Sequence, residues 1–298
     1  MEPLDHLTTE RENDKSAGLD EMSALEIVTL MNGEDRTVAE AVRKALPVIA
    51  EAVEAIVASF KAGGRLIYAG AGTSGRLGVL DASELPPTFG VDPSRAVALL
   101  AGGRDAVFQA KEGAEDDAEA GRRDLQGIRL ESRDAVVGIS ASGRTPYVIG
   151  ALEYAKEIGA KAISLSCNRP ARMSSIADVA IEVVTGPEVL TGSTRLKAGT
   201  AQKMVLNMLS TAAMVRLGKT YKNLMVDVKP TNEKLVDRAR RILMKATGVS
   251  YEEADRALKA ADLQVKVALV MIQTGSTAEE ARARLEASGG FVRAAVKG

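Results

Sequence analysis

Residues 65–76 have the sequence RLIYAGAGTSGR, in which a short apolar run is followed at once by a turn rich in glycine and hydroxyl groups. An apolar run of this length, bounded by turn residues, is typical of a strand that is buried on both faces. Similar runs occupy residues 96–100, 135–139, 162–166 and 179–184, and helical patterns separate several of them. This alternation predicts an α/β fold, with a doubly wound sheet of five parallel strands.

Helical periodicity surrounds the predicted sheet. Asp20 is a suitable N-cap for a helix through Met31, and a second helix is expected over residues 35–62. We expect Pro47 to kink or split this second helix, and the glycine pair that begins at Gly63 to end it. The segments before the first strand therefore predict N-terminal helices that flank the sheet.

The chain divides into three regions by its patterning. Residues 1–18 are polar and predict a flexible tail, and residues 19–230 hold the N-terminal helices and the sheet. Within that region an apolar helix after Gly199 is expected to be a buried packing or dimer helix. Residues 231–298 have only helical patterns, including the capping-box sequence that begins at Ser250, and predict a small helical C-terminal domain.

Composition excludes several classes of function. Lys and Arg number 39 and Asp and Glu number 40, so the net charge of −1 gives no basic surface for nucleic acid or anionic lipid. The single cysteine, Cys167, and single histidine, His6, predict neither a disulfide nor a protein metal site. No apolar run approaches the roughly 20 residues that cross a bilayer, and the N-terminus lacks a secretory pattern. We therefore expect a cytoplasmic protein without a protein metal site.

The turn at residues 70–76 predicts an anion site. Glycines allow the backbone to approach a ligand, and the start of a helix offers unpaired N–H groups. The spacing of Gly70, Gly72 and Gly75 also fits the dinucleotide fingerprint, which requires an acid at the end of the next strand. That position holds Ala101 and two glycines instead. A nucleotide site and a tight turn without ligand remain as alternatives for this segment.

A second turn, SASGRTP at residues 140–146, repeats the arrangement after the third predicted strand. Its three hydroxyl groups lie at the start of a helix, where they suit the oxygens of a phosphate monoester. Serines that only cap the helix are the alternative, although one serine would suffice for that. A third turn, TGSTR at residues 191–195, is expected to close the site.

Two acidic segments are candidates for acid–base chemistry. Glu84 lies in LDASELPPT, where Pro86 and Pro87 predict the end of a helix. Burial among its apolar neighbours would raise the pKa of Glu84 and let it act as an acid. At an exposed helix end, Glu84 would instead be a surface glutamate without a special role. Glu115 lies in KEGAEDD, which by its pattern is a solvated acidic face.

These segments carry a resemblance to a known family. The turns AGTSGR and SASGRT resemble the sugar isomerase (SIS) domain, a doubly wound fold that binds phosphosugars. Together with DASELPPTFG, EGAEDD, TGSTRLKAGTAQK and NLMVDVKPTNEKL, they resemble the N-acetylmuramic acid 6-phosphate etherases. The resemblance extends from about Leu19 to near the C-terminus, and it implies that residues 19–230 form an SIS domain that binds phosphosugar and carries catalysis.

The resemblance implies a reaction and a set of residues. N-acetylmuramic acid 6-phosphate would lose D-lactate by elimination and then add water, which gives N-acetylglucosamine 6-phosphate. The family pattern places Glu84 as the acid and base at C3, and Glu115 as the base at C2. The residues implied to contact substrate are Thr73, Ser74, Ser140, Ser142 and Thr145. We add Arg76 and Arg144 as candidate contacts for the phosphate or the lactyl carboxylate.

The same resemblance implies a homodimer without a metal or redox cofactor, with a small phosphosugar as partner. It also implies a place in the degradation of N-acetylmuramate, which either peptidoglycan recycling or uptake would supply. Two alternatives stay open. A non-catalytic phosphosugar sensor, similar to glucokinase regulatory proteins, would need neither Glu84 nor Glu115. A phosphosugar isomerase would need the base but no acid directed at C3.

Overall fold

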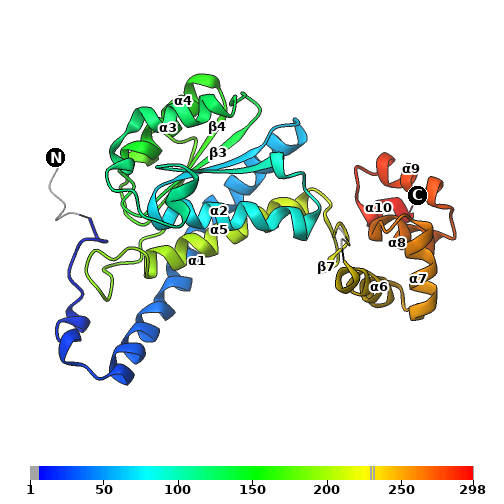
Figure 1. Ribbon diagram of the computed structural model, residues 1–298, viewed down its shortest axis with the longest axis horizontal. Helices are drawn as coiled ribbons and strands as arrows, with labels where there is room; N and C mark the ends of the chain where they lie inside the picture. Colours follow the sequence, from blue (N-terminus) through cyan, green and yellow to red (C-terminus); the bar gives the residue numbers. More distant parts are fainter. Residues whose placement is uncertain (1–6, 229, 231, 298) are drawn as a thin grey trace. The chain divides into compact units, whose positions relative to one another are not determined.

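The computed structural model describes residues 7–228, 230 and 232–297, and Figure 1 shows its elements. His6 lies outside the described residues. The chain forms two compact units: residues up to 82 with 94–210 make the first, and residues 83–93 with those from 211 onward make the second. The sequence-based boundary at residue 231 stays a prediction.

The first unit is built on a sheet of five parallel strands in the order β2-β1-β3-β4-β5. The strands are β1 (Leu66–Gly70), β2 (Ala96–Leu100), β3 (Ala135–Ser140), β4 (Lys161–Ser166) and β5 (Val179–Glu182). Every residue of β1 and β3 is buried, which explains why these strands are uninterrupted apolar runs in the sequence. The predicted five-stranded parallel sheet is confirmed.

Helices cover both faces of this sheet, as a doubly wound fold requires (Figure 1). The helices are α1 (Ala24–Lys61), α2 (Gly72–Phe89), α3 (Ala118–Gly127), α4 (Pro146–Ile158) and α5 (Lys197–Arg216). On one face α3 and α4 share a core with strand residues such as Ile67 and Val136. On the other face Tyr68 of β1 donates a hydrogen bond to Asp81 of α2, which also accepts one from Ser210 of α5.

Helix α1 corrects the prediction of two helices before the sheet. It is one continuous helix that begins after Ser23, whose side chain and Glu26 form a capping box, and that contains Pro47 without a break. A proline inside a helix costs about 3 kcal/mol, whereas each buried valine or isoleucine contributes about 1.5–3 kcal/mol. The buried stripe of α1 lies on both sides of Pro47 and includes Val42 and Ile49, so its burial outweighs the proline.

Helix α2 corrects a second boundary. The sequence predicted an end before Pro86, but the helix continues to Phe89 and includes both prolines. Leu85 and Phe89 lie one turn apart and are both buried, and the N–H of Gly90 donates to the carbonyl of Pro86. Packing of this last turn therefore overrides the local preference of residues before proline for extended backbone.

The second unit is largely helical. Its helices beyond α5 are α6 (Glu233–Thr247), α7 (Tyr251–Ala260), α8 (Val265–Thr274), α9 (Ala278–Ala287) and α10 (Val292–Lys297). Asn232 caps α6, and Ser250 caps α7 with the capping box that the sequence predicts. A hairpin of two short strands, β6 (Thr220–Tyr221) and β7 (Leu224–Met225), precedes α6 and was not predicted.

Residues 7–18 are held against the first unit, although the sequence assigned them to a flexible tail. Thr9 and Asn13 are buried, and Thr9 exchanges hydrogen bonds with the side chain of Asn168. A short 3₁₀ helix, η1, follows at Asp14–Ser16. Among the described residues, no helix combines the length and apolar character needed to span a membrane.

Candidate functional site

The strand order creates a natural ligand site at the carboxyl ends of β1 and β3. These two strands are neighbours in register, with Gly70 paired to Ile139, while β2 lies beyond β1 and β4 lies beyond β3. The chain thus leaves β1 and β3 toward opposite sides of the sheet, and open α/β folds bind ligands at such a point. The two glycine- and hydroxyl-rich turns follow these two strands, so the structure brings them to the same edge.

The turn after β3 gathers three of the predicted contact residues. The Oγ of Ser140 lies 2.7 Å from Oγ1 of Thr145 and 3.3 Å from Oγ of Ser142, and it accepts a hydrogen bond from the N–H of Gly143 at 3.1 Å. Ser140 is buried, whereas Ser142 and Thr145 are partly exposed. The buried hydroxyl group of Ser140 therefore links the residues of the turn. The hydroxyl groups of Ser142 and Thr145 can rotate to donate to a ligand oxygen.

The turn after β1 is held by helix α5. Ser74 is buried and donates to Oε1 of Gln202 at 3.0 Å. A Cβ at Gly199 would lie 3.6 Å from Cγ2 of Thr73, so the first turns of α5 also lie against the start of α2. Only glycine fits at position 75, because a Cβ there would lie 2.6 Å from the carbonyl oxygen of Gly70. The backbone at this turn is thus packed as closely as an anion-binding loop requires.

Gln202 is a site residue that the sequence reasoning missed. Its side chain is fully buried, and its Nε2 has no hydrogen-bond partner among the residues that the structure describes. A buried amide donor without a partner costs about 1–3 kcal/mol, so such groups are exceptional. The sequence offers no clear signal for it, because the segment around it, TAQKMVLNML, also contains Thr200, Lys203 and Asn207.

The two arginines have different surroundings from those expected. Arg76 donates from Nη2 to the carbonyl of Ala106 at 2.8 Å and from Nε to that of Val107 at 2.9 Å. It therefore fixes the 3₁₀ turn η4 (Arg104–Val107) with two of its three nitrogens. Arg144 is partly exposed, and its backbone N–H donates to Oγ of Ser142 at 3.4 Å. Contact of either guanidinium group with an anion stays a prediction.

Glu115 is brought to the turn after β1. It lies in the 3₁₀ turn η5 (Ala114–Asp116), is exposed, and lines a cavity of about 210 Å³. The same cavity is lined by Gly72 and Arg76 from the start of α2. A base at this position would face the cavity next to the turn after β1. The exposure of Glu115 also agrees with the alternative, a solvated acidic surface.

Glu84 lies on α2 and is exposed within this chain. Of the two alternatives for Glu84, the structure shows the exposed one, although Glu84 lies within α2 and not at its end, because the helix continues to Phe89. Glu84 belongs to the second compact unit and Glu115 to the first. Their action as a pair stays a prediction.

The third turn differs from the other two because an internal carboxylate occupies the adjoining helix start. Glu188 is fully buried, and its carboxylate accepts hydrogen bonds from the N–H groups of Lys197 and Ala198 at 2.9 and 3.0 Å. Burial raises the pKa of Glu188, against these hydrogen bonds. The start of α5 is thus already capped, so residues 191–195 do not offer a third free helix start to an anion, and the closing of the site by this turn stays a prediction. Nowhere in the described chain do three or more His, Cys, Asp or Glu side chains form a metal-binding group.

Comparison with known proteins identifies the fold. The SIS domain model matches residues 118–212, and the model for the N-terminal SIS domain of glucokinase regulatory protein matches residues 48–156. A phosphoheptose isomerase from Francisella tularensis has the same fold, with a TM-score of 0.51 and 19% identity over 65% of this chain and 100% of that one. A putative phosphosugar isomerase from Bacteroides fragilis gives a TM-score of 0.51 and 22% identity over 65% and 91% of the two chains. The sheet with its two turns is therefore an SIS domain.

Closer relatives define the family. N-acetylmuramic acid 6-phosphate etherase from Halalkalibacterium halodurans is 60% identical over 98% of both chains. The etherase from Vibrio campbellii is 58% identical over 99% of this chain and 96% of the relative. At this identity and coverage, the chain belongs to the N-acetylmuramic acid 6-phosphate etherase family.

Proposed function

We propose that this protein cleaves the D-lactyl ether of N-acetylmuramic acid 6-phosphate to give N-acetylglucosamine 6-phosphate and D-lactate. The observation that carries the proposal is the near full-length identity of 58–60% to etherases. The geometry supports it, because two turns rich in hydroxyl and N–H groups meet at the switch point of the sheet, where a phosphosugar can bind.

Binding is assigned to neutral donors. A phosphate monoester would accept hydrogen bonds from Ser142 and Thr145 in the turn after β3, with Ser140 supporting that turn. Thr73 and Ser74 in the turn after β1 would contact the same ligand. Hydroxyl and backbone N–H groups suit this task because several can converge on one phosphate without a cluster of basic residues.

The chemistry follows from the position of the ether next to an acidic carbon. In the open-chain aldehyde, the carbonyl at C1 acidifies the proton on C2, and Glu115 removes it as a base. The C3–O bond breaks, and the departing lactate oxygen takes a proton from Glu84. Water then adds to C3 of the unsaturated aldehyde while C2 regains a proton. One carboxyl group must be charged and the other protonated at the start of each turnover.

The surroundings of the reaction are proposed as well. The family resemblance favours a homodimer in the cytoplasm that acts without a metal or redox cofactor. The protein would take part in N-acetylmuramate degradation, and its substrate would be a small phosphosugar of the kind that peptidoglycan recycling supplies.

The test is release of lactate from N-acetylmuramic acid 6-phosphate by the purified protein. In water labelled with heavy oxygen, the label should enter the C3 hydroxyl of the sugar and be absent from lactate, because the lactyl oxygen leaves with lactate. Glu84→Gln and Glu115→Gln should each lower kcat by at least about 100-fold, in the range of a general acid or base. Glu119→Gln, an exposed glutamate on α3, is the control and should keep full activity.

Different outcomes separate the alternatives. Phosphosugar binding without lactate release, by a well-folded protein, would identify a sensor and contradict the proposal. Interconversion of aldose and ketose phosphates that needs Glu115 but not Glu84 would identify an isomerase. Label in lactate would contradict cleavage between C3 and oxygen.

A further inference from the structure

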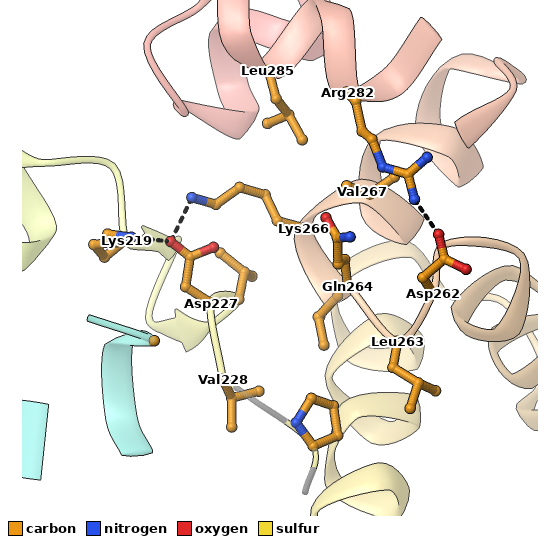
Figure 2. Close-up of a pocket in the computed structure, with 14 residues that line it drawn as sticks. Lys219, Asp227, Val228, Asp262, Leu263, Gln264, Lys266, Val267, Arg282 and Leu285 are labelled. Atoms are coloured by element: carbon orange, nitrogen blue, oxygen red, sulfur yellow. Dashed lines mark hydrogen bonds and ion pairs between the residues drawn. The ribbon is translucent and has the colours of Figure 1, made fainter. Parts of the chain in front are cut away.

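The second compact unit contains a cavity of about 630 Å³ that the proposed reaction does not use (Figure 2). This volume lies within the roughly 300–1,000 Å³ of typical small-molecule sites. The wall combines valine and leucine side chains with a few charged ones. The residues used below are Lys219, Asp227, Val228, Leu263, Lys266 and Leu285.

One wall of the cavity carries an excess of positive charge. The ammonium groups of Lys219 and Lys266 lie 3.1 and 2.7 Å from the same carboxylate oxygen, Oδ2 of Asp227 (Figure 2). The side chain of Lys266 is only 13% exposed, and burial, followed by the charge of Lys219, lowers its pKa against the effect of Asp227. Two cations that share one carboxylate leave one charge without compensation, and each ammonium group has further donors to offer.

The opposite wall is a turn with an unusual choice of residues. After α7, Asp262 and Leu263 have φ values of +51° and +60°, and the N–H of Leu263 donates to the carbonyl of Leu258. Left-handed backbone costs about 1–2 kcal/mol for a residue with a Cβ. Aspartate adopts this backbone conformation more readily than leucine does, so Leu263 is the unusual residue, and its strain points to a use of its side chain.

Helix α9 provides an internal comparison. It ends in the same way, with a hydrogen bond from Gly290 to the carbonyl of Leu285, but its two left-handed residues are Gly289 and Gly290. In the α7 turn the Asp262 carboxylate instead binds Arg282 at 2.5 Å. Leu263 is 37% exposed and faces the cavity, so it adds little to the core of the unit.

We propose that this cavity binds a small organic anion, with its carboxylate or phosphate group on Lys219 and Lys266 and an apolar body against Leu263, Val228 and Leu285. The excess cation supplies the recognition of charge. The strained turn supplies an apolar surface that glycine would not. The assignment does not depend on the etherase reaction.

The experiment is isothermal titration calorimetry of the full-length chain, without phosphosugar, against hexanoate, hexyl phosphate and hexylamine. We expect at least one of the two anions to bind at least tenfold more tightly than hexylamine, and the tighter one identifies the head group. Lys266→Met and Lys219→Met should each weaken that binding at least tenfold. Lys234→Met, an exposed lysine at the start of α6, is the matched control and should change nothing.

Leu263→Gly separates binding from folding. Glycine relieves the left-handed backbone, so the melting temperature should hold or rise while binding of the anion weakens. Binding of the anions that is no tighter than that of hexylamine would overturn the proposal. So would anion binding that both lysine variants retain, or a melting temperature that falls in Leu263→Gly.

Discussion

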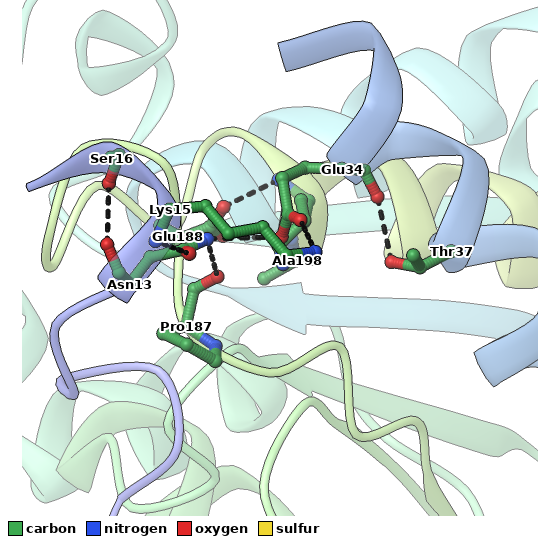
Figure 3. A network of polar contacts seen from close by, with 9 residues as sticks. Asn13, Lys15, Ser16, Glu34, Thr37, Pro187, Glu188 and Ala198 are labelled. Carbon is green, nitrogen blue, oxygen red and sulfur yellow. Dashed lines mark hydrogen bonds and ion pairs between the residues drawn. The ribbon is translucent and has the colours of Figure 1, made fainter. Parts of the chain in front are cut away.

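The most direct test of the structure is the buried ion pair that joins α1 to the start of α5. Oε2 of Glu34 lies 2.7 Å from Nζ of Lys197, and the side chains are 8% and 3% exposed. Glu34 also accepts hydrogen bonds from Asn13 at 3.0 Å and from Lys15 at 2.7 Å (Figure 3). We predict that Glu34→Gln strongly destabilises the first unit, because the buried ammonium group of Lys197 loses the charged carboxylate that it contacts directly.

The expected magnitude follows from burial. Removal of one partner from a buried pair costs about 3–5 kcal/mol, whereas loss of an exposed pair costs about 0–1 kcal/mol. Lys15 provides the matched comparison, because its side chain is 69% exposed although it binds the same carboxylate. Glu34→Gln should therefore lower the free energy of unfolding by about 3 kcal/mol or more, and Lys15→Met by less than about 1 kcal/mol.

The assay is urea unfolding followed by circular dichroism at neutral pH. The double variant Glu34→Leu with Lys197→Met should be more stable than Glu34→Gln alone, because replacing both charges removes the desolvation cost of each. If the free energy of unfolding of Glu34→Gln lies within about 1 kcal/mol of that of the parent, the reasoning is refuted, because an exposed ion pair contributes that much. A double variant less stable than Glu34→Gln would also refute it.

Low pH should destabilise the parent protein in the same way, because protonation removes the charge of Glu34. Burial alone would raise the pKa of Glu34, but hydrogen bonds from Lys15, Lys197 and Asn13 outweigh burial and hold the pKa at about 2, below its usual 4.5. A depressed pKa adds stability that is fully present above pH 4.5 and is lost as the pH falls toward 2. The parent should lose more stability over this interval than Glu34→Gln does.

Three further predictions concern the interior of the first unit. Gln202→Leu should change the melting temperature little, because it removes a buried donor without a partner but also the acceptor of the Ser74 hydroxyl group, yet it should increase KM for the phosphosugar at least tenfold; an unchanged KM would contradict its role at the turn after β1. Gly150→Ala should lower the unfolding midpoint strongly, because its Cβ would lie 2.0 Å from the carbonyl oxygen of Ala118, whereas Gly127→Ala, with open space around the Cβ, should not. Cys167 is fully buried, and burial raises the pKa of its thiol to about 12, so a thiol reagent should label it only after denaturation.

The sheet was predictable because its signal is local. Each strand of a doubly covered parallel sheet must be apolar on both faces, so five short apolar runs were visible without knowledge of their partners. The start of β2 at Ala96 and that of β3 at Ala135 agree with the predicted ones. The order of the strands is not encoded in any one run, and the site at the carboxyl ends of β1 and β3 depends on that order.

The helix boundaries were less predictable because they depend on packing. Proline rules predicted a kink or split at Pro47 and an end before Pro86, but α1 is not split and α2 continues to Phe89. Each rule states a local cost of a few kcal/mol, which the burial of side chains on either side of Pro47, or of Leu85 and Phe89, can offset. Gln202 was missed for a related reason: it acts on Ser74, which is 128 positions away in the sequence.

The three glycine- and hydroxyl-rich turns look equivalent in the sequence, and the structure makes them unequal. Glu188 already fills the start of α5, so a ligand phosphate would compete there with a buried carboxylate. The starts of α2 and α4 lack such an acid among the hydrogen bonds described for them, and their turns offer Ser74 and Ser142. We therefore expect an external anion to bind at the other two helix starts and not at this one. This explains how a chain with net charge −1 can bind a phosphosugar without a basic surface.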